Sequence, residues 1–151
     1  ETALCRVVEY LAAALVLVSR DFAEAHGLTP LAVVRGWAST SLTPAETGLA
    51  PTTAIPKALA RAGLSQSDIQ SIEINEAFAS VPVAAVKILG LDPEIVHGNG
   101  SGCSLGHPIG CTGARMIVTM VNELERTDSQ FGLVAMCAAG GMGSATVIER
   151  V

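Results

Sequence analysis

Short apolar runs rich in branched side chains alternate with amphipathic stretches along this 151-residue chain. The apolar runs have the length of buried strands, and the amphipathic stretches repeat their apolar residues with a helical period. Expected strands occupy residues 12–19, 31–40, 71–75, 131–138 and 144–151, and expected helices occupy residues 20–27, 51–63, 76–90 and 108–126. Such alternation predicts an α/β fold. The turn sequence AGGMG predicts that the last two strands form a hairpin.

Glycine, proline and polar residues mark the boundaries of these elements. Three glycines are expected to end helices: Gly27, Gly63 and Gly90. Residues 41–49 are polar and predict a loop, whereas SQSD at 65–68 has the spacing of a short capped helix. Pro82 predicts either a kink or a late start in the helix expected over residues 76–90.

The composition limits both the packing of the chain and its partners. Half of the residues are hydrophobic and 15% are charged, as expected for a sheet covered by helices or for a fragment that a missing partner would cover. The net charge of −5 argues against nucleic-acid binding. No apolar run reaches the roughly 18 residues of a membrane helix, and the first residues do not resemble a signal peptide. We therefore expect a soluble, cytoplasmic protein with no membrane partner.

Residues 98–113, GNGSGCSLGHPIGCTG, form a glycine loop in which His107 precedes Pro108. Because proline favours the first turn of a helix, we expect His107 at an N-cap, where the helix dipole disfavours imidazolium. A neutral imidazole there could act as a base or a hydrogen-bond donor, or could merely cap or pack. Zinc binding with Cys103 and Cys111 is a weaker alternative, because there is no obvious fourth ligand. All four cysteines are expected to be free thiols: Cys5, Cys103, Cys111 and Cys137.

Two further polar residues lie where expected strands end. Asn75 could offer its amide to a ligand or water, or could cap the following helix. Cys137 could face a cleft beside the backbone amides of Ala139 and Gly140, which could bind an oxyanion, or could be a small buried hydrophobe. Open α/β sheets bind ligands at such junctions. Together with His107, these residues point to thiol or carbonyl chemistry.

Three motifs in order, INEAFA, GHPIGCTGAR and CAAGGMGSA, closely resemble the C-terminal half of the thiolases, the acetyl-CoA acyltransferases. The resemblance implies a βαβαβαββ half with a mixed sheet and helices packed on its faces. In that family, two such halves form a five-layered enzyme, and the acyl-carrying cysteine lies in the N-terminal half. Residues 1–151 would then be a single thiolase C-terminal domain, with a divergent start at residues 1–10.

The resemblance also implies roles for individual residues. His107 would activate the nucleophile and stabilise the thioester oxyanion, and Asn75 would hold a water at that oxyanion site. Cys137 would be the acid or base that exchanges a proton with the acetyl-CoA methyl group. The backbone amides at Ala139 and Gly140 would form a second oxyanion hole, although the family has glycine at position 139, and alanine would be strained there if φ is positive. Phe78 would line the pantetheine channel.

The implied activity is Claisen condensation or thiolysis of 3-ketoacyl-CoA, as in lipid and fatty acid metabolism. Coenzyme A thioesters would be substrates, and neither a metal nor a further cofactor is expected. None of the four cysteines lies in a context like that of the family's nucleophile, so we expect the chain alone to be an incomplete enzyme. Its expected partners are acyl-CoA or coenzyme A and either a second copy or a nucleophile-bearing N-terminal half. The alternatives are a non-catalytic CoA-binding or assembly subunit, or a decayed fragment.

Overall fold

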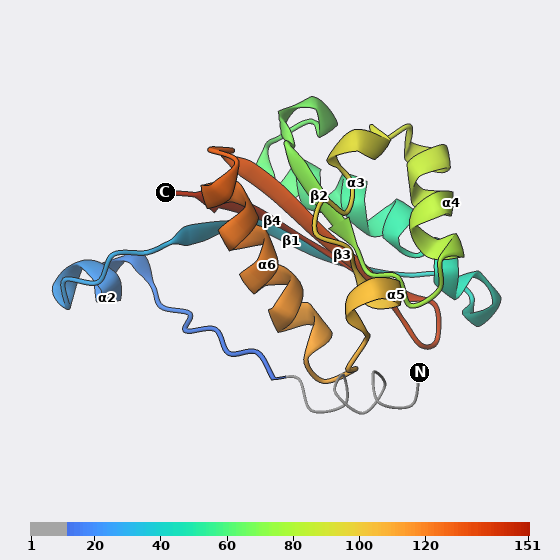
Figure 1. The fold of residues 1–151 in the computed structure, drawn as a ribbon, viewed down its shortest axis with the longest axis horizontal. Coiled ribbons are helices and arrows are strands. Elements are labelled where there is room, and N and C mark those ends of the chain that lie inside the picture. The colour runs from blue at the N-terminus through green and yellow to red at the C-terminus, as the bar shows by residue number, and fades with distance from the viewer. Residues whose placement is uncertain (1–11) are drawn as a thin grey trace.

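The computed structural model describes residues 12–151, which build a mixed four-stranded sheet with the strand order β1-β4-β3-β2 (Figure 1). The divergent start at residues 1–10, including Cys5, lies outside the described residues. The strands are β1 (Ala32–Ser41), β2 (Ser71–Ile74), β3 (Phe131–Ala138) and β4 (Met142–Arg150). The β2 and β3 strands are parallel, whereas β4 is antiparallel to both β1 and β3. The expected α/β class and the closing hairpin are therefore confirmed.

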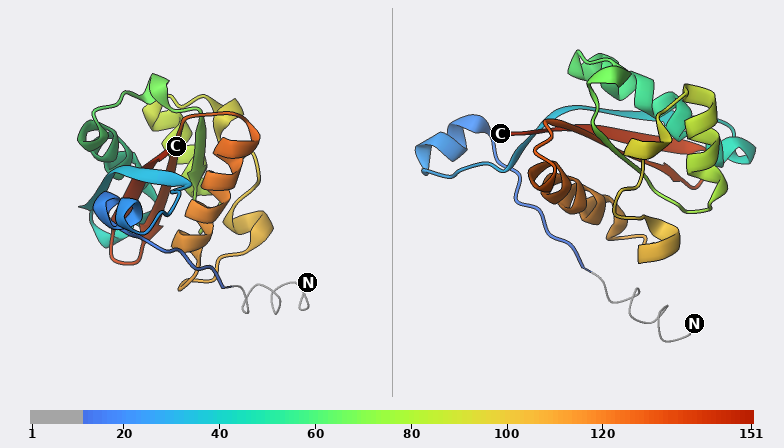
Figure 2. Two further views of the ribbon diagram at one scale, coloured as in Figure 1. Left: turned by 90° about the vertical axis from the view of Figure 1, so that its left-hand side faces the viewer. Right: turned by 45° about the horizontal axis from the view of Figure 1, so that its top comes forward.

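Helices pack on both faces of the sheet (Figure 2). One face is covered by α3 (Pro51–Ala62) and α4 (Ser80–Leu89), which share a core with alternate residues of the strands, such as Ile74, Leu133 and Ala135. The opposite face carries α6 (Thr112–Arg126), whose Met116, Met120 and Leu124 pack against Val134 and Ile148. The sheet is thus buried on both sides where these helices cross it, in accordance with the low content of charged residues.

Several boundaries fall where the sequence predicts them. The α2 (Arg20–Ala25), α3 and α4 helices are each followed within two residues by the expected glycine. The α4 helix begins at Ser80, so Pro82 lies in its first turn and the late-start alternative is correct. The short helix η2 (Gln66–Asp68) has the predicted cap from Ser65. The segment expected to be a loop before α3 instead contains a 3-10 helix, η1 (Pro44–Leu49).

Two predictions about secondary structure are wrong. Residues 12–19 form no strand within the described structure, and Val16 is 88% exposed, because branched apolar residues favour a strand only where a neighbouring strand pairs with them. His107 is not an N-cap, because Pro108–Cys111 forms a turn and α6 begins only at Thr112. The backbone amides of Cys111 and Thr112 both donate to the carbonyl of Pro108, at 2.8 and 2.9 Å.

The segment between α4 and α6 contains the least regular structure of the domain. A short 3-10 helix, η3 (Pro93–Ile95), leads to Val96. Val96 forms an isolated parallel bridge with Ile72 of β2 and is not part of a strand. The glycine loop (residues 98–113) follows and contains a helix that the sequence did not predict, α5 (Gly102–Leu105). Between Ala12 and Val151, no helix is long and apolar enough to cross a membrane.

Candidate active site

Asn75 and Cys137 lie at the same edge of the sheet because they are at the carboxyl ends of neighbouring parallel strands. The register pairs Ile74 with Ala135, and the Asn75 amide extends it by donating to the Ala135 carbonyl at 2.8 Å. Side chains alternate between the faces of a strand. Cys137 therefore shares the core beneath α3 and α4 with Ile74, whereas Asn75 lies on the α6 side of β2.

Asn75 and His107 meet on the α6 side of the sheet. Asn75 is fully buried, and its Nδ2 lies 3.3 Å from Nε2 of His107. The same Nδ2 lies 3.5 Å from Nδ1 of His107. Nδ1 also lies 2.7 Å from the hydroxyl of Thr112, which donates to the Pro108 carbonyl at 3.0 Å. Ala79, not Asn75, is the N-cap of α4, so the capping alternative for Asn75 is wrong.

The glycine loop approaches Asn75 closely. A Cβ atom at Gly102 would lie 2.7 Å from the Glu76 carbonyl oxygen and 3.0 Å from Oδ1 of Asn75, which is closer than side-chain carbons pack. Only glycine therefore fits at this position without displacing the strand end. Oδ1 of Asn75 is buried and accepts no hydrogen bond from any residue in the described part of the chain.

Glu76 contacts the glycine loop and the residue before it, through two interactions that the sequence did not reveal. One carboxylate oxygen accepts from the backbone amide of Cys103 at 3.0 Å, and the other lies 3.1 Å from Nδ1 of His97. The Ile74 amide donates to Nε2 of His97 at 3.0 Å. Because Nε2 is an acceptor here, the ring hydrogen lies on Nδ1 and is donated to Glu76. His97 thus connects β2 to the start of the glycine loop.

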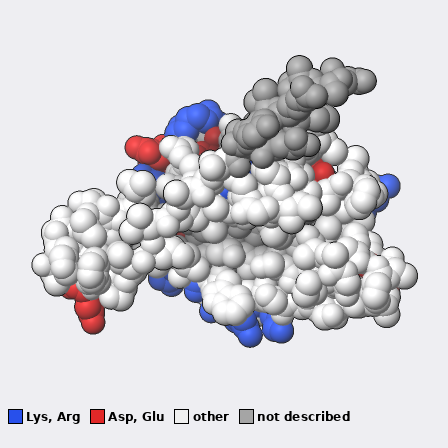
Figure 3. Space-filling view, turned by 90° about the horizontal axis from the view of Figure 1, so that it is seen from below, with Lys and Arg blue, Asp and Glu red and all other residues white. Residues whose placement is uncertain are grey.

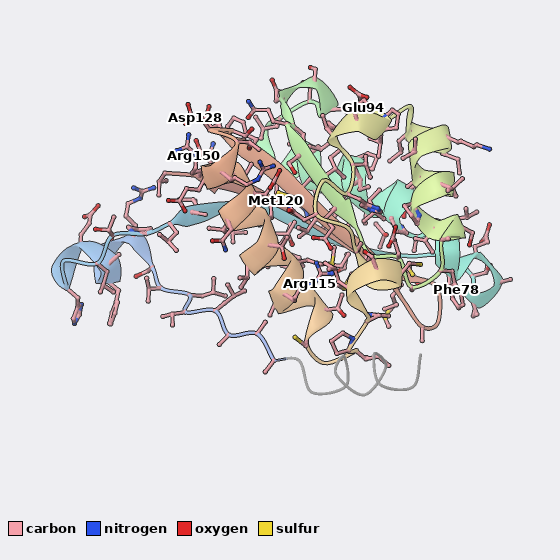
Figure 4. The ribbon with its side chains drawn as sticks, in the orientation of Figure 1. Phe78, Glu94, Arg115, Met120, Asp128 and Arg150 are labelled. Atoms are coloured by element: carbon pink, nitrogen blue, oxygen red, sulfur yellow. The ribbon has the colours of Figure 1, made fainter. Side chains whose placement is uncertain are left out.

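Two more carboxylates tie the glycine loop to the domain. Glu73 is buried in β2, accepts from the Ser101 hydroxyl at 3.0 Å and forms an ion pair with Arg115. Figure 4 labels Arg115, which lies on α6. Glu123 accepts from the Asn99 side chain at 2.8 Å. A hydrogen bond from Arg126 holds the pKa of Glu123 below its ordinary value, against the opposing effect of burial. The available sequence signal was a glutamate inside an apolar strand, two residues before Asn75.

Cys137 has a different environment. Burial raises the pKa of its thiol, and a backbone hydrogen bond offsets this only in part. The hairpin turn (residues 139–141) follows, in which the Gly141 amide donates to the Thr47 hydroxyl at 3.0 Å. The amides of Ala139 and Gly140 donate to no acceptor among the described residues, and both residues are exposed. The φ angle of Ala139 is not positive, so alanine is not strained there.

Phe78 lies in the loop between β2 and α4 and is 71% exposed. Its carbonyl accepts from the Val81 amide at 3.0 Å, which fixes the backbone of this loop. Figure 4 shows Phe78 at the end of the domain where α5 and the hairpin turn also lie. Within residues 12–151, no three histidine, cysteine or acidic side chains gather closely enough to hold a metal ion.

Comparison with known families gives a match over most of the chain. A family model described as thiolase, C-terminal domain, matches residues 28–150. Over 138 residues, the chain is 46% identical to the 3-ketoacyl-CoA thiolase of Bacillus subtilis, a match that covers 91% of this chain and 35% of the relative. The 3-ketoacyl-CoA thiolase of Acinetobacter baylyi is 49% identical over 142 residues, which cover 93% of this chain and 36% of the relative.

Solved structures agree with the sequence comparisons. The acetyl-CoA acetyltransferase of Bacillus anthracis superposes with a TM-score of 0.86 at 43% identity, covering 89% of this chain and 34% of that one. Human mitochondrial 3-ketoacyl-CoA thiolase in complex with CoA gives a TM-score of 0.87 at 36% identity, with the same coverage of both chains. The chain thus spans about a third of the length of the proteins that it matches.

Proposed function

The chain belongs to the thiolase C-terminal domain family, and from this premise we propose that it supplies one half of an acyl-CoA acyltransferase active site. In this proposal, the chain provides His107, Asn75 and Cys137, and the acyl-carrying cysteine comes from a nucleophile-bearing N-terminal half. The observation that carries the proposal is the hydrogen-bonded contact between Asn75 and His107 at the sheet edge where Cys137 also lies. The proposed substrates are thioesters of coenzyme A, and the reaction requires no metal or further cofactor.

Thiolysis of a 3-ketoacyl-CoA begins with proton transfer from the partner's cysteine to Nε2 of His107. The resulting thiolate attacks C3, the bond between C2 and C3 breaks, and the acyl group stays on the partner's cysteine. The electron pair left at C2 forms the enolate of acetyl-CoA. Its oxygen accepts a hydrogen bond from His107 and from a water that Asn75 holds.

Cys137 acts as the acid in the next step by giving its proton to C2, which releases acetyl-CoA. A thiol with a raised pKa is suited to this task because it still holds its proton at neutral pH. The Cys137 thiolate then takes the proton of an incoming CoA thiol, whose sulfur accepts the acyl group from the partner's cysteine. That cysteine leaves as a thiolate and recovers its proton from His107. The free amides of Ala139 and Gly140 bind the oxyanion of this second step, and Phe78 borders the pantetheine chain.

Two observations support an N-terminal half as the partner. The match to the C-terminal domain family begins at residue 28. The relatives match over 91% or more of this chain, which requires that some residues before position 28 also match. Part of the sequence shared with the relatives therefore precedes the C-terminal domain itself. Residues 12–19 lie in that part, are apolar and extend away from the sheet. Figure 3 shows a face whose middle is uncharged, with most charged side chains near its margin. We also propose a homo-oligomeric state, which the resemblance implies, and a cytoplasmic location, which the sequence favours because its first residues do not resemble a signal peptide.

Complementation tests this proposal. The chain is mixed or co-expressed with the part of the Bacillus subtilis relative that precedes the matched region, and thiolysis of acetoacetyl-CoA is assayed. We expect activity only when both halves are present, with losses of about 10²–10⁴-fold for His107→Ala or Cys137→Ala. Thiolysis by the chain alone that survives dilution and is abolished by Cys137→Ala would overturn the proposal. A complex that binds CoA without thiolysis would instead favour the non-catalytic subunit.

A further inference from the structure

We propose that Thr112 is the positioning residue that allows Nε2 of His107 to serve first as a proton acceptor and then as a hydrogen-bond donor. This inference rests on the proposed function, because it assigns a partner to the histidine of that site. Thr112 is the first residue of α6 and is 1% exposed. Its hydroxyl lies 2.7 Å from Nδ1 of His107, the shortest hydrogen bond that the ring makes with a described residue.

The hydroxyl of Thr112 has two acceptors within reach, and one of them, the Pro108 carbonyl, already accepts other hydrogen bonds. The Pro108 carbonyl receives the amides of Cys111 and Thr112 at 2.8 and 2.9 Å as well as the Thr112 hydroxyl at 3.0 Å. A carbonyl oxygen has two lone pairs, so the two amides already satisfy it. The hydroxyl hydrogen can therefore turn from Pro108 to His107 without leaving a buried acceptor unpaired.

Two hydrogen-bond arrangements of His107 follow. In the first, the Thr112 hydroxyl donates to Pro108 and accepts from Nδ1–H, which leaves a lone pair on Nε2 next to the Asn75 amide. In the second, the hydroxyl donates to Nδ1, and Nε2 carries the hydrogen. That hydrogen is then available to the enolate oxygen of the proposed reaction. The doubly protonated ring is satisfied as well, because Nδ1–H donates to Thr112 in the first arrangement.

Thiolysis uses each of these states. Nε2 needs its lone pair to take the proton of the nucleophile, and it needs a hydrogen to stabilise the enolate oxygen. Thr112 pairs with Nδ1 in both states and in the imidazolium between them. A valine has the same shape but no hydroxyl, so it leaves Nδ1–H without an acceptor and disfavours both the imidazolium and the tautomer that has a free Nε2.

His97 provides an internal contrast within the same chain. Its Nε2 faces a backbone amide, that of Ile74, which can only donate. Its Nδ1 faces the carboxylate of Glu76, which can only accept. His97 is therefore held in the single tautomer with hydrogen on Nδ1, and a change at Thr112 should leave it unaltered.

Nitrogen-15 NMR of the histidine rings in the 151-residue chain tests the inference without any partner or activity. In the unsubstituted chain, we expect the His107 nitrogen shifts to indicate a substantial fraction of hydrogen on Nδ1. Thr112→Val should move the hydrogen to Nε2, and Thr112→Ser should restore the original shifts. Thr53→Val, which removes a partly buried hydroxyl near the start of α3, is the matched control and should leave both His107 and His97 unchanged.

His107 shifts that are identical in the unsubstituted chain and in Thr112→Val, with the fold intact by circular dichroism, would overturn the inference. In the complemented enzyme, Thr112→Val should lower kcat by about 10–100-fold with little change in KM, and Thr112→Ser should recover most of it. Full activity of Thr112→Val in an active complex would also overturn the inference and would leave the proposed function standing. If the NMR result holds but no mixture is active, only the proposed function fails.

Discussion

The glycine loop and the hairpin turn border the candidate site from two sides, and different kinds of contact hold them in place. The glycine loop is held by buried or partly buried carboxylates, which reach it from β2, from the second residue after β2 and from α6: Glu73, Glu76 and Glu123. The hairpin turn is held by close backbone packing. The loop should therefore be sensitive to the loss of single polar atoms, and the turn should be sensitive to added volume.

The close packing of the hairpin turn is clearest at Gly141. This residue has a φ angle of +87°, and a Cβ atom there would lie 2.7 Å from the Thr43 carbonyl oxygen and still closer to that of Leu42. Gly140 has nearly the same φ angle, +86°, but a Cβ atom there would meet nothing within 4 Å. The two neighbours thus separate the effect of a clash from the effect of backbone strain.

The largest effect is expected for Gly141→Ala, because the added methyl group must displace two backbone carbonyls. We expect the free energy of unfolding to fall by roughly 4 kcal/mol or more, measured by urea denaturation. The control Gly140→Ala should cost only about 1–2 kcal/mol, the strain of a left-handed alanine. Equal losses of unfolding free energy in the two variants would show that backbone strain accounts for the cost of alanine at Gly141, and would contradict close packing of the turn.

Glu73→Ala tests the glycine loop in the opposite way, by removing polar atoms and adding no volume. The substitution leaves Arg115, whose side chain is 16% exposed, without its carboxylate, and we expect a loss of about 3 kcal/mol in the free energy of unfolding. The matched control is Glu149→Ala, because its partner Arg35 is 45% exposed, and it should cost about 1 kcal/mol or less. The contrast between loop and turn fails if Glu73→Ala is as mild as its control.

A smaller effect is expected in the reactivity of the thiols. Cys103 is exposed, whereas Cys137 is buried. Because the pKa of Cys137 is raised, a smaller fraction of it is thiolate at any given pH than of an ordinary thiol. Iodoacetamide should modify Cys137 more slowly than Cys103 by roughly tenfold at neutral pH. The rate of Cys137 modification, followed by peptide mass spectrometry, should rise with pH, and this rise should occur at a higher pH than for an ordinary thiol. Faster labelling of Cys137 at neutral pH would contradict its role as a thiol that keeps its proton.

The sequence predicted the parts of the fold that depend on local patterns. The period of α6 and the turn chemistry between β3 and β4 were sufficient to define those elements. Residues 12–19 were predicted wrongly because their strand-like composition says nothing about whether a partner strand is present. The prediction of an N-cap at His107 was also wrong, because Pro108 begins the turn that precedes α6 and does not begin the helix itself.

The candidate site was predicted in outline but not in its supports. The sequence singled out Asn75, His107 and Cys137 because each lies next to a strand end or a glycine-rich turn. The carboxylates of Glu73, Glu76 and Glu123 were missed because they bind groups more than 20 residues away, which no local pattern reveals. Thr112 was missed because its distance to His107 depends on how the Pro108–Cys111 turn folds.

The central claim, that this chain supplies acid–base groups while another half carries the acyl group, can be tested by intact-mass spectrometry. The complemented enzyme is mixed with acetoacetyl-CoA, quenched in acid, and both chains are weighed. We predict one acetyl group on the N-terminal half and none on this chain, with the adduct lost in His107→Ala. An acetyl group on Cys137 or on any other residue of this chain, with none on the other half, would contradict the account.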